Sequence, residues 1–155
     1  MLYCNERDVW HKNSHIQEQE NMKIPSYVIL KPRLFNVIPW LSNDTANAIY
    51  PFIFLPRAIY NNLQSPHPNQ QYVALLIHEE IHRKRQKEIG WVIFNIKYLT
   101  SPKFRFNEEL LAIKEAIKYL KKHSIPFDFE KNAQSLSGWL YFWPISKYDA
   151  KKGRW

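Results

Sequence analysis

Residues 69–90 read NQQYVALLIHEEIHRKRQKEIG. Asn69 is a typical helix N-cap, because its side-chain oxygen can accept a hydrogen bond from the first turn. Gly90 is a typical helix stop. Between them, apolar residues recur at helical spacing on one side: Ala74, Leu75, Ile77 and Ile81. The sequence therefore predicts a helix from about Gln70 to Ile89.

The middle of this helix carries His78-Glu79-Glu80-Ile81-His82, an HExxH motif. Residues four apart lie one turn apart on the same face, so the two imidazoles can reach one ion at about 2.0–2.1 Å. Glu79 lies close in angle to both histidines and can take a proton from an attacking water molecule. At this chain's frequencies of His and Glu, chance produces the motif about 0.015 times. The alternative is a pair of surface histidines on an amphipathic helix.

A catalytic zinc site needs a third protein ligand and an open position. Residues 78–119 resemble the small, minimal gluzincins, HExxH zinc metallopeptidases that include phage and bacterial members. In these proteins the motif is followed by glycine and aromatic residues, and then by a glutamate with an alanine three positions on. Glu109 and Ala112 match that second element, and residues 133–141 are also similar to the family. The resemblance implies Zn²⁺ held by His78, His82 and Glu109.

Two details refine this resemblance. Gln86 departs from it, because it stands four residues after His82 where three are expected. Glu108 is the competitor of Glu109, and either glutamate can simply be an acid near a helix N-terminus. Glu109 lies three residues after Phe106 and four before Ile113, on the side expected to face the motif helix.

Further helices are expected after Gly90. Trp91, Phe94 and Tyr98 recur at helical spacing and indicate a short second helix. Ser101 and Pro102 fit the cap and first position of a third helix, which ends near Lys122. Its apolar stripe consists of Phe106, Leu110, Ile113, Ile117 and Leu120. A last helix is expected over residues 128–142.

The 155 residues suit a single domain, residues 1–155. Residues 1–23 are polar and aperiodic, and we expect them to be irregular. Residues 24–60 consist of short apolar runs broken by prolines and are expected to be strand-rich, whereas residues 70–142 are expected to be helical. This order predicts an α+β fold. The resemblance makes it zincin-like, with a small N-terminal β-sheet before the active-site helix and further packed helices. It also implies a sheet edge that binds an extended peptide, with residues 49–55 as the candidate strand. The alternative is that residues 49–55 form an ordinary core strand.

The composition indicates which kinds of binding partner this chain favours. A net charge of +8 and a pI of about 9.5 favour anionic partners. The single cysteine, Cys4, excludes an internal disulfide. Charged residues near Met1 do not fit a signal peptide, and no apolar stretch reaches 18 residues. We therefore expect a cytoplasmic protein with no membrane partner.

Three functional hypotheses follow. The leading one is a zinc-dependent peptidase that acts on a peptide or protein. The alternative is a catalytically weak zincin-fold binding module for nucleic acid or another polyanion, and the third is a basic helical protein without metal. His123 is a weaker candidate for a metal ligand and is more simply a helix-end residue, and His67 is a loop residue. Tyr98, Tyr119 and Tyr141 can stabilise an oxyanion, and Trp139, Tyr141 and Trp143 can stack on bases, but packing in the core is the simpler explanation for these aromatic residues.

Overall fold

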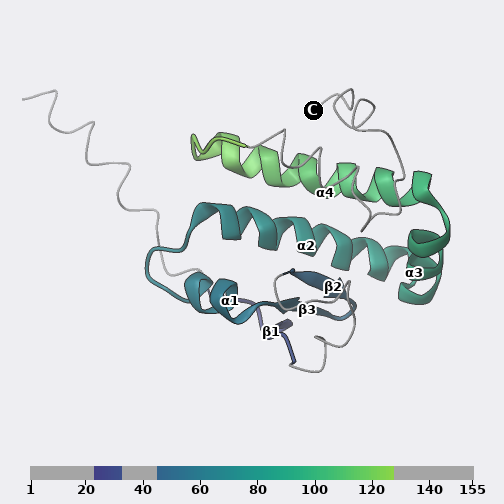
Figure 1. Ribbon diagram of the computed structural model, residues 1–155, viewed down its shortest axis with the longest axis horizontal. Coiled ribbons are helices and arrows are strands. Elements are labelled where there is room, and N and C mark those ends of the chain that lie inside the picture. The colour runs from purple at the N-terminus through teal and green to yellow at the C-terminus, as the bar shows by residue number, and fades with distance from the viewer. Residues whose placement is uncertain (1–22, 33–44, 128–155) are drawn as a thin grey trace, which may run out of the picture.

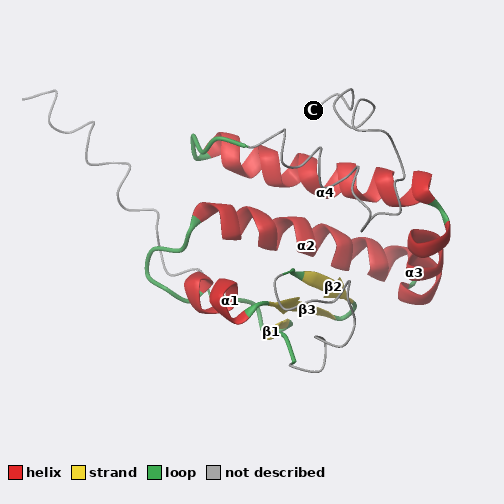
Figure 2. Cartoon of the chain, viewed as in Figure 1, coloured by secondary structure: helices red, strands yellow, loops and turns green. Residues whose placement is uncertain are grey.

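The computed structural model describes residues 23–32 and 45–127. Its elements are, in order, β1 (Val28–Leu30), β2 (Asn47–Ile49), β3 (Phe52–Leu55), α1 (Arg57–Leu63), α2 (Gln70–Ile89), α3 (Trp91–Thr100) and α4 (Pro102–Lys122). Strands precede the long helices, so this part of the chain is α+β, as expected (Figure 2). The helix expected over residues 128–142 and nearly all of the segment 1–23 lie outside the described residues.

The sheet has the order β1-β3-β2, which makes β3 its central strand. β1 pairs with β3 in parallel and β2 pairs with it antiparallel. The expectation of one edge strand over residues 49–55 is therefore wrong. This segment contains the end of β2, a turn at Tyr50 and Pro51, and then β3. Pro51 has no N–H for a ladder and so favours the turn, and β2 takes the edge position.

The strand-rich region also ends earlier than expected, because α1 follows directly after β3. Pro56 is its N-cap residue, and a proline at a helix start removes no hydrogen bond that the helix needs. Ile59 and Leu63, one turn apart, are buried in the core that covers the sheet. This spacing of four was the signal for a helix in residues 57–63.

The motif helix α2 lies between the sheet and α4 (Figure 1). On the sheet side, Val73 and Leu76 join a core that also contains Val28, Ile53, Leu55, Ile59 and Leu63. On the other side, Ala74 packs with Ala116 and Leu120 of α4. Because α2 is covered on two sides, its buried residues do not form the single stripe that we expected.

α2 and α4 run antiparallel. Near the start of α2, the Tyr119 hydroxyl of α4 donates a hydrogen bond to the side chain of Gln70. Three turns further along α2, His82 lies beside Glu109, which is near the start of α4. The alanines at the contact, such as Ala74, let the helices come close, so that side chains of α4 reach the HExxH motif.

α3 connects these two helices at one end of the pair (Figure 1). Gly90 has a φ of 90°, in the left-handed region that suits glycine, and it lets α3 begin at once where α2 ends. The Ser101 side chain accepts a hydrogen bond from the Phe104 N–H at 3.3 Å and caps α4, as expected. Among the described residues, no helix is both long and apolar enough to cross a membrane.

Candidate metal centre

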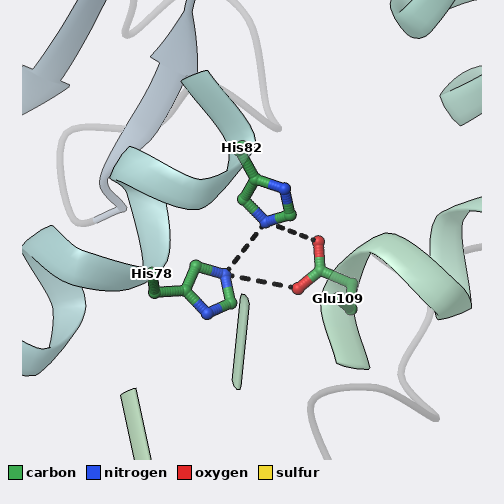
Figure 3. Close-up of side chains that lie close together, drawn as sticks. All are labelled: His78, His82 and Glu109. Carbon is green, nitrogen blue, oxygen red and sulfur yellow. Dashed lines mark hydrogen bonds and ion pairs between the residues drawn. The ribbon is translucent and has the colours of Figure 1, made fainter. Parts of the chain in front are cut away.

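The two histidines of the motif and one glutamate of α4 point toward one another (Figure 3). His78 and His82 lie one turn apart on α2, and their Nε2 atoms are 3.1 Å apart. Glu109 brings Oε2 to 3.4 Å from His78 Nε2 and Oε1 to 3.2 Å from His82 Nε2. The structure thus brings together the three side chains that we expected to be metal ligands.

The spacing of these donor atoms suits a small metal ion. In a tetrahedral site with bonds of about 2.0–2.1 Å, ligand atoms lie about 3.3–3.4 Å from one another. The three donor separations of 3.1, 3.2 and 3.4 Å are close to that value. His78, His82 and Glu109 are therefore close enough together to hold one metal ion, and a fourth tetrahedral position would remain for another ligand.

The electrostatics of the cluster favour an added positive charge. Burial by itself lowers the pKa of His82, but the Glu109 carboxylate outweighs burial and raises this pKa to about 9. Burial also raises the pKa of Glu109, yet the neighbouring histidines, His82 first, hold that pKa well below its usual range. A buried carboxylate needs a compensating charge. A proton on His82 or a metal cation can supply it.

Tyr98 of α3 supports the Glu109 carboxylate. Its hydroxyl donates a hydrogen bond to Glu109 Oε1. Its ring stacks on Phe94 at 5.6 Å between centroids and meets His82 edge-on at 6.1 Å. Arg105, which is buried, donates a hydrogen bond to the backbone carbonyl of Tyr98 at 2.7 Å. The sequence presented Tyr98 as a core aromatic, and the structure adds this contact to the site.

Glu108 is also buried, but it is occupied elsewhere. Arg85 of α2 holds it with two hydrogen bonds of 2.9 Å and contacts Glu88 at 2.8 Å as well. Arg85 lies 23 positions before Glu108, so no local pattern reveals the pair. The pair depends on the antiparallel packing of α2 and α4, in which His82 lies beside Glu109. Glu108 therefore joins the two helices by an ion pair.

Glu79 is buried next to the donor cluster. The residue is only 7% exposed, and within residues 23–32 and 45–127 we find no hydrogen bond or ion pair to its carboxylate. Its negative charge contributes to the raised pKa of His82, so it lies near that imidazole. Its oxygens are not among the fully buried atoms that lack a partner in the described residues, so solvent can reach them. Glu79 is accordingly available to bind water beside the three donors.

Gln86 connects the motif helix to the sheet. Its side-chain Nε2 donates to the Ala48 carbonyl, and its Oε1 accepts from the Tyr50 N–H, both at 2.8 Å. These bonds use the Ala48 carbonyl and the Tyr50 N–H, so these two backbone groups cannot pair with an added peptide strand. Gln86, which does not fit the resemblance to minimal gluzincins, therefore has a structural role. The sequence signal for this contact was the position of Gln86, one turn after His82 on a buried face of the helix.

The remaining candidates lie away from the cluster or outside the described residues. His123 is the C-cap residue of α4, and its Nδ1 is 2.9 Å from the Tyr119 carbonyl. The Tyr119 hydroxyl is bonded to Gln70. His67 is exposed in the segment between α1 and α2. Trp139, Tyr141 and Trp143 lie outside the described residues.

Comparisons of this chain with protein-family models, curated proteins and solved structures find no match. The geometry of the donor cluster and the HExxH motif are accordingly the grounds for assigning a function.

Proposed function

We propose that this chain is a zinc-dependent peptidase of the zincin type, in which His78, His82 and Glu109 bind the metal and Glu79 is the general base. One observation carries the proposal. Three donors from two helices meet at separations of 3.1, 3.2 and 3.4 Å. The small sheet packed against the motif helix agrees with the resemblance to minimal gluzincins.

This donor set fits zinc, which the HExxH motif favours. Two imidazoles and one carboxylate with an open fourth position form a donor set of catalytic zinc sites, whereas structural zinc sites are usually closed by four protein ligands. Calcium and magnesium prefer sites made of oxygen ligands. Two histidine nitrogens in a cluster of three donors therefore argue against those ions.

The residues have separate tasks in the proposed reaction. A bound zinc ion supplies Lewis-acid activation of water and of the scissile carbonyl. The water oxygen attacks the carbonyl carbon while Glu79 accepts a proton from that water. Glu79 then delivers the proton to the leaving nitrogen as the C–N bond breaks. Tyr98 keeps the Glu109 carboxylate in place through its hydrogen bond.

The direct test is cleavage of a pool of fluorescence-quenched peptides by the zinc-loaded chain. We expect turnover that stops when a chelator is added and returns when zinc is restored. Turnover that a chelator leaves unchanged would contradict the proposal, and so would zinc-loaded protein that cleaves no peptide of the pool.

The two adjacent glutamates should respond differently to the same substitution. Glu109→Gln removes a donor of the cluster and should lower zinc affinity by more than about 100-fold, which exceeds the usual effect of losing a supporting contact. Glu108→Gln should leave zinc affinity nearly unchanged. It weakens the bond to Arg85 and should lower the free energy of unfolding by about 1–3 kcal/mol. Chelator competition and chemical denaturation measure the two effects, and equal zinc affinities would refute the assignment of Glu109.

Tyr98→Phe tests the support of Glu109. The variant retains the ring but removes the hydroxyl that donates to Glu109, and we expect zinc affinity to fall by about 10–100-fold. Tyr119→Phe is the matched control, because it removes a hydroxyl bonded to Gln70 at the far end of α2. Competition with a zinc chelator should separate the two variants. An equal change in affinity would show that Tyr98 has only a general structural role.

The alternative function, a binding module for nucleic acid or another polyanion, rests on the net charge of +8. The basic cluster that follows the motif adds little to it. Arg83 pairs with Glu80, and Arg85 pairs with Glu88 and Glu108. Polynucleotide binding that weakens steeply with salt, in a zinc-loaded chain without hydrolysis, would favour this alternative.

A further inference from the structure

α3 has two apolar sides. Phe94 is buried on one side, and Tyr98 on that side reaches the donor cluster. On the other side, four large apolar side chains are at least half exposed: Val92 50%, Ile93 53%, Ile96 57% and Leu99 64%. These four residues fall within an arc of about 120° on the helix, whereas Trp91, 53% exposed, lies beside Tyr98 in helical angle. We call these four residues the α3 face.

The polar side chains of α3 leave this face without hydrogen-bonding groups. The Asn95 amide donates to the Trp91 carbonyl, and the Thr100 hydroxyl donates to the Ile96 carbonyl, both at 2.7 Å. Both side chains therefore bond to their own helix. A contiguous exposed apolar patch of this kind marks a contact with a protein or a membrane.

The charged residues on α3 and next to it in the sequence are mainly positive. Residues 91–106 contain no aspartate or glutamate. Lys97 lies on α3 itself, Lys103 follows it and Lys87 precedes it, and all three are exposed. The nearest acid before α3, Glu88, is paired with Arg85. An apolar face with lysines on its helix and beside it in the sequence complements a partner that is apolar inside and anionic outside.

We propose that the α3 face docks this protein onto an anionic lipid surface, with the helix lying flat on the membrane. A ten-residue helix is about 15 Å long, half of what is needed to span the hydrocarbon core. Apolar side chains that enter the headgroup region and lysines that attract anionic lipids together produce such binding.

This proposal revises the expectation of no membrane partner and is independent of the proposed peptidase function. The absence of a spanning helix among the described residues does not bear on surface binding. Because Phe94 and Tyr98 link the inner side of α3 to His82, docking holds the metal centre about one helix diameter, roughly 10 Å, from the lipid.

Sedimentation with phosphatidylcholine vesicles, with and without phosphatidylglycerol, tests the proposal. We expect the protein to bind the vesicles that contain phosphatidylglycerol, and to bind them less tightly as salt is added. The double variant Ile96→Ser, Leu99→Ser keeps the charge but removes two exposed apolar side chains. It should bind at least about tenfold more weakly.

Leu111→Ser is the matched control, because Leu111 is 46% exposed on α4, away from the α3 face. It should bind the vesicles as the unchanged protein does. If the double variant loses helical circular dichroism, Leu99→Ser alone provides the same comparison at the most exposed position. The proposal is overturned if the unchanged protein does not bind anionic vesicles at low salt, or if the α3 variants bind as tightly as the control. A dimer that the double variant dissociates, in a protein that ignores vesicles, would instead assign the face to a second copy of the chain.

Discussion

Replacement of Glu79 by glutamine should lower kcat by about 10²–10⁴-fold while zinc content and fold stay the same. Glutamine has nearly the shape of glutamate, but its amide cannot accept the proton of the attacking water. Glu79 is not one of the three donors that meet at the cluster, so its replacement should spare metal binding. Steady-state kinetics on a cleaved peptide, with zinc measured on the same samples, checks both expectations.

Glu80→Gln is the matched control for this variant. Glu80 is the next residue of the same helix, but its carboxylate is paired with Arg83 at 2.7 Å. Its replacement should change kcat far less than that of Glu79. Comparable turnover by Glu79→Gln and the unchanged protein would show that Glu79 is not the general base.

The second large effect is expected for the histidines of the motif. Either His78→Ala or His82→Ala should lower zinc affinity by more than about 100-fold, because each removes one of three donors. His82 is the more deeply buried of the two. Its loss also leaves a void and removes the closer ring beside the Glu109 carboxylate, so His82→Ala should destabilise the fold more than His78→Ala does. Chelator competition and thermal unfolding report the two quantities.

His123→Ala controls for the loss of any histidine. His123 lies at the far end of α4 from Glu109 and contacts Tyr119. Its replacement should leave zinc affinity unchanged. Retention of one tightly bound zinc by both motif variants would refute the proposed site.

Local sequence signals were sufficient for α2, α3 and α4, whereas α1 was missed. Asn69 and Gly90 are the cap residues of α2, as predicted. Ser101 caps α4, which begins at Pro102. These residues act within one turn of the backbone they cap, so their effect can be read without tertiary context. The spacing within HExxH likewise fixes the relation of His78 to His82, because both lie on one helix.

Contacts between distant segments were harder to predict. The split of residues 49–55 depends on how β3 pairs with two neighbours, and the bonds of Gln86 to β2 join residues 36 and 38 positions apart. The Arg85–Glu108 pair and the Tyr98–Glu109 bond depend on the packing of α2, α3 and α4. Periodicity identifies the buried side of each helix, but it does not specify which residue of another helix lies opposite.

Anomalous X-ray scattering at the zinc absorption edge, from crystals of the chain purified with zinc, tests the central claim most directly. We expect one anomalous peak per chain, bonded to Nε2 of His78, Nε2 of His82 and a carboxylate oxygen of Glu109 at about 2.0–2.2 Å. A peak bonded to Glu108 or His123, or no peak beside the HExxH motif, would contradict the claim.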